Sequence, residues 1–327
     1  MDHLSPIPAS PSLAVTDAER ERVEQAIRAR RAPSTVDAYR RRWRRFVAWC
    51  DEREASPFPA DAGLVAVYAT SLADAGRAIS TIEGALSAIR HHHVEAGATD
   101  PTSTAGVAAV RAGLRRELGV APRQPSHPLT LDELHLLLSP MDPARSLRDC
   151  RDRALILLGF AGALRRSEVA FLHVGHLDFR RDGIVITIAK SKGDQEGRGQ
   201  TVGIARGQHH STDPVAAVRS WLDRTGRAAE SEAPLFSPIA WSDARPLQRH
   251  LTGRSVCRTI QARGEVVGVS GLTGHSLRSG HATVAAEAGA ATDRLARQMR
   301  HRSLESTKPY IRPAQILIDT TSSALGL

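Results

Sequence analysis

The first third of the chain carries apolar residues at helical spacing, in runs separated by capping residues and glycines. This spacing predicts amphipathic helices, because residues three and four apart share one helical face. Short loops and the lack of an alternating strand pattern then predict a small helical bundle. We expect its helices at residues 17–31, 33–54 with Ser34 as N-cap, 61–74, 80–97 opened by a capping box from Ser80 to Glu83, and 104–118.

A proline-rich segment, Val120–Pro128, separates this bundle from the rest of the chain. Its three prolines prevent a helix and favour extended backbone. The segment therefore predicts a linker at 120–128, between a helical domain at 16–119 and a second domain at 129–327. The proline-rich start of the chain, residues 1–15, predicts a flexible tail.

The second domain is predicted to be mainly helical with a small β-hairpin. It opens at a capping box from Thr130 to Glu133. A very apolar helix follows at 153–164 and should carry Arg165 at its end. β-Branched residues at 184–188 predict a strand, and a return strand is expected at 200–205 after a polar, glycine-rich turn. Further helices are expected at 213–224, 252–265, 276–288 and 292–300.

The bulk composition fits two globular domains and a polyanionic partner. A chain of 327 residues can form two domains of ordinary size, and a hydrophobic content of 41% excludes a disordered protein. The formal net charge of +9 favours nucleic acid as the partner, and an anionic membrane surface as the second choice. A basic surface that is merely solvated is the alternative.

The cysteines indicate a reducing compartment. Cys50, Cys150 and Cys257 are far apart and form no C-x-x-C motif, so free thiols are favoured over a zinc site or disulfides. Residues 1–15 do not resemble a signal peptide, and no apolar run reaches membrane-spanning length. We therefore expect a cytoplasmic protein.

The second predicted helix interleaves arginines with aromatic residues. Trp43, Phe46 and Trp49 recur at a spacing near three and four, which predicts a core face. The arginines would then face DNA and contact phosphates, which gives affinity and salt dependence rather than sequence choice. These arginines are Arg40, Arg41, Arg42, Arg44 and Arg45.

Arg90 and three consecutive histidines, His91–His93, end the fourth predicted helix. A metal site is one interpretation of the triplet. Consecutive helical residues point in different directions, however, so a polar face turned to DNA or solvent is favoured. We therefore count Arg90 and His91 among the candidate DNA-binding residues and expect no metal.

The later part of the chain contains two arginines, two histidines and a late tyrosine that suit phosphodiester chemistry. Arginine is permanently charged and grips phosphate with a fixed fork of donors. Histidine exchanges protons near neutral pH, and a phenol can act as a nucleophile. The set predicts cleavage of a phosphodiester without a metal. Its members are Arg165, His275, Arg278, His301 and Tyr310.

The motifs around these residues resemble those of the tyrosine recombinases, or phage integrases. Leu164–Glu168 resembles the L-R-x-S-E box of the family, and His275–Arg278 resembles its H-x-L-R box. Arg300–Ser303, followed by Tyr310, resembles the G-H-x-S…Y ending, with arginine where glycine is usual. The order and spacing of the motifs agree, and the resemblance covers roughly residues 20–325.

This resemblance implies a SAM-like N-terminal bundle that binds core DNA and a mixed α/β catalytic domain, as in the simple two-domain, Cre-like members. It implies an enzyme that cuts and rejoins duplex DNA through a 3′-phosphotyrosyl intermediate and a Holliday junction, without metal, ATP or another cofactor. The implied partners are duplex DNA with inverted-repeat sites and a homo-tetramer on two such sites. The C-terminal segment 314–327 would be exchanged between subunits; packing onto its own domain is the alternative.

The resemblance also assigns roles to the motif residues. Arg165 and Arg278 would bind the phosphate, His301 would hydrogen-bond a non-bridging oxygen, and Tyr310 would be the nucleophile. His275 is a suitable acceptor for the phenol proton. In addition, Glu168, three residues after Arg165 on a helix, could orient Arg165 or His275, or could simply be a solvated charge.

Lysine usage points to a further candidate. Lys190, Lys192 and Lys308 are the only lysines among 44 basic residues, and lysine can release a proton that arginine holds. Lys190 and Lys192 begin the predicted hairpin turn, where the family carries a lysine that protonates the leaving oxygen. Lys192, which precedes a glycine, is our candidate for this general acid, with Lys190 as the substitute.

Pro309 disfavours helical geometry at Lys308, so we expect Tyr310 on a turn or at a helix start. Two other functions remain open from the sequence. One is a DNA-relaxing enzyme similar to type IB topoisomerases, which would use the same residues as a monomer. The other is a DNA-binding protein without catalysis.

Overall fold

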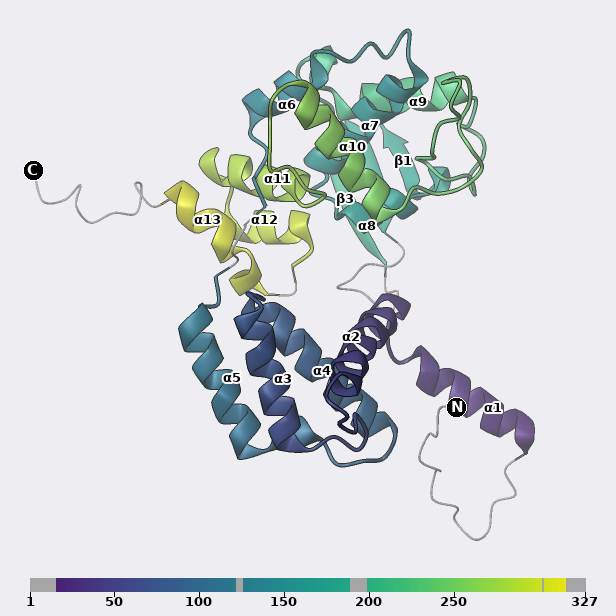
Figure 1. Ribbon diagram of the computed structural model, residues 1–327. Helices are drawn as coiled ribbons and strands as arrows, with labels where there is room; N and C mark the ends of the chain where they lie inside the picture. Colours follow the sequence, from purple (N-terminus) through teal and green to yellow (C-terminus); the bar gives the residue numbers. More distant parts are fainter. Residues whose placement is uncertain (1–15, 122–125, 189–198, 302, 316–327) are drawn as a thin grey trace, which may run out of the picture. The chain divides into compact units, whose positions relative to one another are not determined.

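The computed structural model describes residues 16–121, 126–188, 199–301 and 303–315, with the side chains of residues 28, 29, 33 and 312–315 left aside (Figure 1). The chain divides into two compact units, with the boundary between Pro125 and Ser126. Each unit is described here by itself.

The first unit is a bundle of helices, as the spacing of apolar residues predicts. It contains α1 (Asp17–Ala29), α2 (Pro33–Asp51), α3 (Ala62–Asp74), α4 (Ile79–Glu95), a 3-10 turn (Pro101–Ser103) and α5 (Ala105–Leu118). Its core joins α2, α3, α4 and α5 through Phe46, Tyr68, Ile82 and Ile89 together with smaller apolar residues. The rings of Phe46 and Trp49 each lie 5.0 Å from that of Tyr68, so the predicted aromatic core face of α2 is confirmed.

Two predicted helix caps are wrong. Ala32 is the N-cap of α2, and Ser34 lies inside the helix because Pro33 takes the first position, where its missing N–H costs nothing. Helix α4 begins at Ile79 without a side-chain cap, so Ser80 does not open it. Glu83, the other half of the expected capping box, pairs instead with Arg115 of α5.

The second unit is mostly helical and contains one small sheet. Its helices are α6 (Leu131–Leu138), α7 (Leu147–Ala161), α8 (Arg166–Phe171), α9 (Pro214–Thr225), α10 (Gly253–Val266), α11 (Ser276–Glu287), α12 (Thr292–Met299) and α13 (Lys308–Gln315), with 3-10 turns at Val174–His176, His210–Thr212 and Leu304–Ser306. The predicted fold class, mainly α with a small sheet, is confirmed.

The sheet has three antiparallel strands in the order β1-β2-β3: β1 (Leu177–Arg180), β2 (Gly183–Ile188) and β3 (Gln200–Ala205). The predicted hairpin is β2 with β3, in a register that pairs Ile184 with Ile204 and Ile186 with Val202. Strand β1 was not predicted, because four residues with two of them charged carry too little pattern. Residues 189–198, which include Lys190 and Lys192, lie outside the described residues.

The helix expected at 153–164 is displaced, which changes the setting of Arg165. Helix α7 runs from Leu147 to Ala161, and a turn through Ala163, whose φ is 47°, separates it from α8. Arg165 is therefore not the end of an apolar helix but the N-cap of α8. The apolar composition of the turn hid this break from the sequence pattern.

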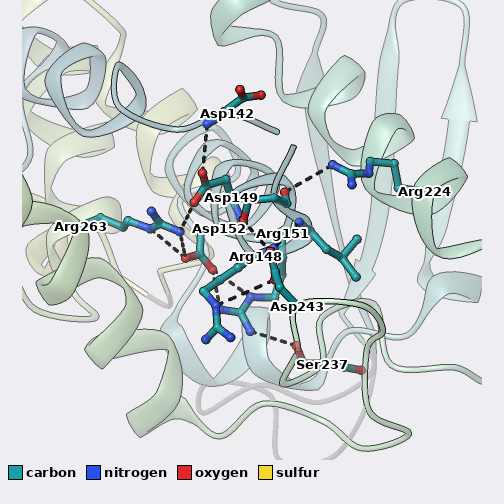
Figure 2. Close-up of polar contacts among 11 residues, drawn as sticks. Asp142, Arg148, Asp149, Arg151, Asp152, Arg224, Ser237, Asp243 and Arg263 are labelled. Atoms are coloured by element: carbon teal, nitrogen blue, oxygen red, sulfur yellow. Dashed lines mark hydrogen bonds and ion pairs between the residues drawn. The ribbon is translucent and has the colours of Figure 1, made fainter. Parts of the chain in front are cut away.

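A buried polar network fixes α7 in the second unit (Figure 2). Asp152 accepts hydrogen bonds from Arg151 at 2.6 Å and from Arg263 at 2.6 Å. Arg263 also pairs with Asp149 at 2.6 Å, which ties α10 to α7. At the start of α7, the carboxylate of Asp243 accepts from the backbone N–H of Arg148 at 2.9 Å. The positive charges of Arg151 and Arg263 thus compensate the negative charges of Asp149 and Asp152.

We expect Asp152→Ala to lower the free energy of unfolding by about 3 kcal/mol, because it leaves Arg151 and Arg263 without their shared carboxylate. Urea unfolding of the full chain measures this. Asp178→Ala is the matched control, since the Asp178–Arg180 pair is exposed and should contribute less than about 1 kcal/mol. Equal losses in the two variants would contradict the prediction.

Candidate active site

The second unit brings together six of the residues that the sequence singles out. Arg165 and Glu168 lie at the start of α8, and His275 and Arg278 at the start of α11. His301 follows α12, and Tyr310 lies in the first turn of α13. Helix α8 is far from the three consecutive helices α11, α12 and α13 in the sequence, and the contacts below join all four into one site. The six residues are Arg165, Glu168, His275, Arg278, His301 and Tyr310.

The hydroxyl of Tyr310 lies 2.9 Å from Nε2 of His275. Burial raises the pKa of this phenol, while the charges of Arg278 and Arg165 lower it. The expected position at a helix start is confirmed, since Tyr310 is the third residue of α13. The expectation for Lys308 is wrong, because Lys308 begins α13 and Pro309 is tolerated in its first turn.

His275 keeps an exposed edge, yet its pKa is lowered, first by burial and then by the charges of Arg278, Arg165 and Arg166. A pKa below the ordinary value near 6.5 keeps the imidazole neutral at pH 7. When the phenol of Tyr310 donates the hydrogen bond, Nε2 of His275 is the unprotonated acceptor. This is the geometry that proton transfer from the phenol requires.

Three hydroxyl groups hold the loop in front of His275. Thr273 Oγ1 accepts from the backbone N–H of His275 at 3.1 Å, and Ser276 Oγ accepts from the backbone N–H of Thr273 at 2.8 Å. Ser126 Oγ hydrogen-bonds to both hydroxyls, at 2.7 Å and 3.1 Å. This cluster could not be predicted from the sequence pattern, because Ser126 is distant along the chain from the residues it contacts.

Close packing also fixes the helix that carries His275 and Arg278. Leu129 N–H donates to Ser276 O at 3.2 Å, and a Cβ on Gly280 would lie 2.2 Å from Leu129 O. Only glycine allows this approach of the backbone to α11. The start of the second unit therefore presses against the helix that carries His275 and Arg278.

Arg278 lies almost fully inside the protein, with 2% of the residue exposed. Its Nη1 donates to Ala163 O at 2.5 Å, and its Nη2 donates to Met299 O. Burial, followed by the charges of Arg165 and Arg300, lowers its pKa to about 9. The guanidinium is thus still charged at neutral pH.

Glu168 orients Arg165. Arg165 Nη1 donates to Glu168 Oε1 at 2.6 Å, and the backbone N–H of Arg165 donates to Oε2 at 2.8 Å. The side chain of Glu168 is 1% exposed and that of Arg165 22% exposed. The interpretation of Glu168 as a solvated charge is wrong, and of its two possible partners it contacts Arg165. Arg165 keeps an exposed side from which it can reach a ligand.

His301 hydrogen-bonds through Nδ1 to the hydroxyl of Thr307 at 2.8 Å, and its ring lies 6.2 Å from that of Tyr310. Burial and then the charge of Arg278 lower its pKa to about 4, so the ring is neutral at pH 7. Thr307, which is fully buried, was not recognised from the sequence. Its only sequence signal was its position between His301 and Tyr310.

Arg300 is a second residue whose role the sequence did not show. Its backbone is left-handed, with φ 53° and ψ 47°, at the end of α12. Glycine adopts this conformation freely, which explains why glycine is usual here in the motif. The buried side chain of Arg300 donates to Glu168 Oε2 at 2.6 Å.

The candidate DNA-binding arginines of the first unit are mostly exposed. Arg40, Arg41, Arg44 and Arg45 are exposed on α2, whereas Arg42 is partly buried against Gly84 of α4. On α4, the exposed Arg90 forms an ion pair with Asp100 at 3.3 Å, and the ring of His91 lies 4.7 Å from that of Tyr39.

The expectation of a polar or DNA-facing histidine triplet is wrong for His93. His93 is fully buried, its Nδ1 donates to Ile89 O at 2.9 Å, and its Nε2 accepts from Ala60 N–H at 2.9 Å. The ring of His92 stacks on Trp43 at 4.0 Å. Packing and backbone hydrogen bonds therefore account for these two histidines.

The described residues contain no group of three His, Cys, Asp or Glu side chains placed to hold a metal ion. Nor does any helix within them combine the length and the apolar character that crossing a membrane requires.

Comparisons with known proteins place the chain in a family. The sequence profile of the phage integrase family matches residues 128–315. An integrase/recombinase described as a XerD homologue, from Selenomonas ruminantium, is 34% identical over 298 residues, which cover 88% of this chain and 84% of that protein. The chain belongs to the phage integrase family and is a tyrosine site-specific DNA recombinase.

Solved structures share the fold. A fragment of lambda integrase, a dimer bound to a COC′ core site, matches with a TM-score of 0.59 at 18% identity, over 89% of this chain and 93% of that one. A lambda integrase tetramer bound to a Holliday junction matches with a TM-score of 0.57 at 17% identity, over 89% and 75% of the two chains.

Acid should destabilise the second unit through His281. This residue lies beside Arg278 on α11, and burial, opposed by a hydrogen bond with Phe160 and reinforced by Arg278 and Arg300, lowers its pKa to about 4. The unfolded chain, with an ordinary histidine pKa of about 6.5, binds the proton first. The stability from the neutral ring is therefore present above pH 6.5 and lost as the pH falls towards 4.

We expect His281→Gln to reduce the dependence of the free energy of unfolding on pH between 6.5 and 4, measured by urea unfolding, and His301, whose pKa is also about 4, to account for part of the slope that remains. His209→Gln, a change at an exposed histidine, is the control and should leave the wild-type slope. A wild-type slope in His281→Gln would show that another group causes the acid sensitivity.

Proposed function

We propose that this recombinase breaks a DNA phosphodiester by direct attack of the Tyr310 phenol on phosphorus. A bond forms between the phenolic oxygen and phosphorus, the bond to the 5′-oxygen breaks, and a 3′-phosphotyrosyl ester remains. The observation that carries the proposal is the 2.9 Å contact between the Tyr310 hydroxyl and the neutral His275. His275 takes the phenol proton as the bond to phosphorus forms.

The arginines stabilise the charge on the non-bridging oxygens, which is the main demand of phosphoryl transfer. Arg165 and Arg278 bind the phosphate, His301 hydrogen-bonds one of its oxygens, and Glu168 holds Arg165 in place. These side chains supply positive charge themselves, so we propose a reaction that needs no metal. The phosphotyrosyl ester retains the energy of the broken bond, so rejoining needs no ATP.

The leaving 5′-oxygen requires a proton. We assign this step to Lys192, with Lys190 as the alternative, because lysine can donate a proton and these two precede β3 in the chain. Both lysines lie outside the described residues.

We further propose that two enzyme pairs act on two DNA sites with inverted repeats and pass through a Holliday junction, as a homo-tetramer. The tetrameric lambda integrase on a Holliday junction is the model for this assembly. In this proposal residues 16–119 grip the duplex, 120–128 connect to the catalytic domain at 129–327, and 314–327 exchange between subunits. The gripping residues are Arg40, Arg41, Arg42, Arg44, Arg45, Arg90 and His91.

A covalent adduct is the test of the chemistry. We expect the protein, incubated in EDTA with nicked duplexes that carry its own flanking attachment sequence, to form a protein–DNA adduct visible on a denaturing gel. Tyr310→Phe should abolish the adduct, because it removes only the nucleophilic oxygen, and Tyr39→Phe is the matched control that should retain it. An absolute requirement for magnesium would contradict the proposal.

Strand exchange between two sites then distinguishes the recombinase from an enzyme that only relaxes DNA. Recombinant products should appear with two sites and not with one. Relaxation of supercoils on any duplex, without exchange, would overturn the proposed tetramer and leave the cleavage chemistry intact.

The rate of adduct formation should report the lowered pKa of His275. A base works in its neutral form, which persists to a lower pH when the pKa is lowered. The rate should therefore rise with pH and reach its plateau at a lower pH than an ordinary imidazole would give. His275→Gln should lower the plateau by about 100-fold and remove this limb of the profile. If the rate of His275→Gln still rose with pH in the same range, the titration would belong to another group.

A further inference from the structure

Arg300 lies buried beneath the residues of the candidate site. Its side chain is 3% exposed, and its donors are directed to groups within the protein. Its Nη2 donates to Glu168 Oε2 at 2.6 Å, and its Nη1 donates to Gln298 O at 2.9 Å. Longer hydrogen bonds run to Gly162 O at 3.4 Å and Ala163 O at 3.3 Å.

One carboxylate therefore serves two guanidinium groups. Glu168 Oε1 accepts from Arg165 Nη1 at 2.6 Å, and Glu168 Oε2 accepts from Arg300 Nη2 at 2.6 Å. Oε2 also accepts from the backbone N–H of Arg165 at 2.8 Å. The position of Arg165 thus depends on the position of Glu168, and Glu168 is held from its far side by Arg300.

Arg300 also shares an acceptor with Arg278. Ala163 O accepts from Arg278 Nη1 at 2.5 Å and from Arg300 Nη2 at 3.3 Å. Each arginine of the candidate site is thus one group away from Arg300. Glu168 lies between Arg165 and Arg300, and Ala163 O lies between Arg278 and Arg300.

The backbone conformation makes arginine a costly choice at this position. A long side chain at φ 53° is uncommon, whereas glycine adopts this conformation without strain. The buried Nε of Arg300 has no hydrogen-bond partner among the described residues. A residue that served only to end α12 would be better as glycine.

We propose that Arg300 is a positioning residue, which fixes the guanidinium of Arg165 through Glu168 and so aligns it with the scissile phosphate. This inference rests on the proposed function, because it assumes that Arg165 binds the phosphate. It adds a third arginine to the site, one that acts through another residue.

The main test is Arg300→Gly, which fits the left-handed backbone and removes the side chain. We expect single-turnover adduct formation on a saturating nicked duplex to slow by about 10- to 100-fold, because a misplaced phosphate-binding group is costly in rate. The Kd for DNA should stay within about twofold of wild type, since Arg300 is buried. Glu54→Gly is the matched control: Glu54 is exposed at φ 52°, so its change relieves the same strain and should leave the rate unchanged.

Two further variants separate positioning from folding. Arg300→Lys keeps a positive charge near Glu168 but lacks the fork of donors, so it should restore part of the rate lost in Arg300→Gly. In a Glu168→Gln background, Arg300→Gly should slow the reaction by less than about threefold, because the two residues act on Arg165 in series. The proposal would be overturned if Arg300→Gly slowed the reaction as much in the Glu168→Gln background as in the wild-type background. It would also be overturned by a wild-type rate in Arg300→Gly.

Side-chain ¹⁵N NMR of the DNA-free protein gives a readout that does not depend on cleavage. The Arg165 guanidinium signal should be protected from solvent exchange in wild type and in Glu54→Gly, and exposed in Arg300→Gly. One outcome is that Arg300→Gly exposes the Arg165 signal while the wild-type enzyme forms no Tyr310 adduct. This outcome would refute the proposed function and retain the positioning role. Protection that persists in Arg300→Gly would refute the positioning role whatever the enzyme does.

Discussion

The buried carboxylate of Glu168 is the charge on which the candidate site depends. Arg165, Arg278 and Arg300 bring three positive charges into one site, and like charges at this range repel strongly when water is excluded. Glu168 is the negative charge that offsets them, through hydrogen bonds to two of the three guanidinium groups. The excess positive charge that remains suits the binding of a phosphate anion.

Backbone carbonyls complete this compensation. The turn between α7 and α8 places Ala163 at a positive φ, and its carbonyl accepts from both Arg278 and Arg300. The network around Asp152 and Arg263 holds α7, and α7 ends at this turn. The charge compensation in the site thus depends on where α7 ends. The buried network that stabilises α7 therefore also helps to position the groups of the site.

The sequence predicted the elements with strong local patterns. The periodicity of α3 and α5 and the β-branched residues of β2 and β3 depend on local packing, so these elements were found close to their observed bounds. The motifs brought Arg165, His275 and Tyr310 to attention because their residue types suit one reaction. Which of them meet in space required the fold.

Most of the errors have physical causes outside the local sequence pattern. Ser34 looked like a cap, but Pro33 takes the first position of α2. Ser80 also looked like a cap, but α4 begins at Ile79, and Glu83 pairs with Arg115 of α5. His93 looked polar, but its two ring nitrogens meet backbone groups from separate segments. Arg300 looked like a departure from a motif, because the partner that explains it, Glu168, is distant in the sequence.

The contact of Ser126 with Thr273 and Ser276 has a consequence for where the catalytic unit begins. The capping box at Thr130 marks the first helix of this unit, and a fragment that starts there would retain every helix and strand of it. It would nevertheless lose the hydroxyl that joins the loop before His275 and the backbone of Leu129 that covers Gly280. The part of the chain that supports the catalytic unit therefore begins before α6, and it includes residues 126–129, which form no helix or strand.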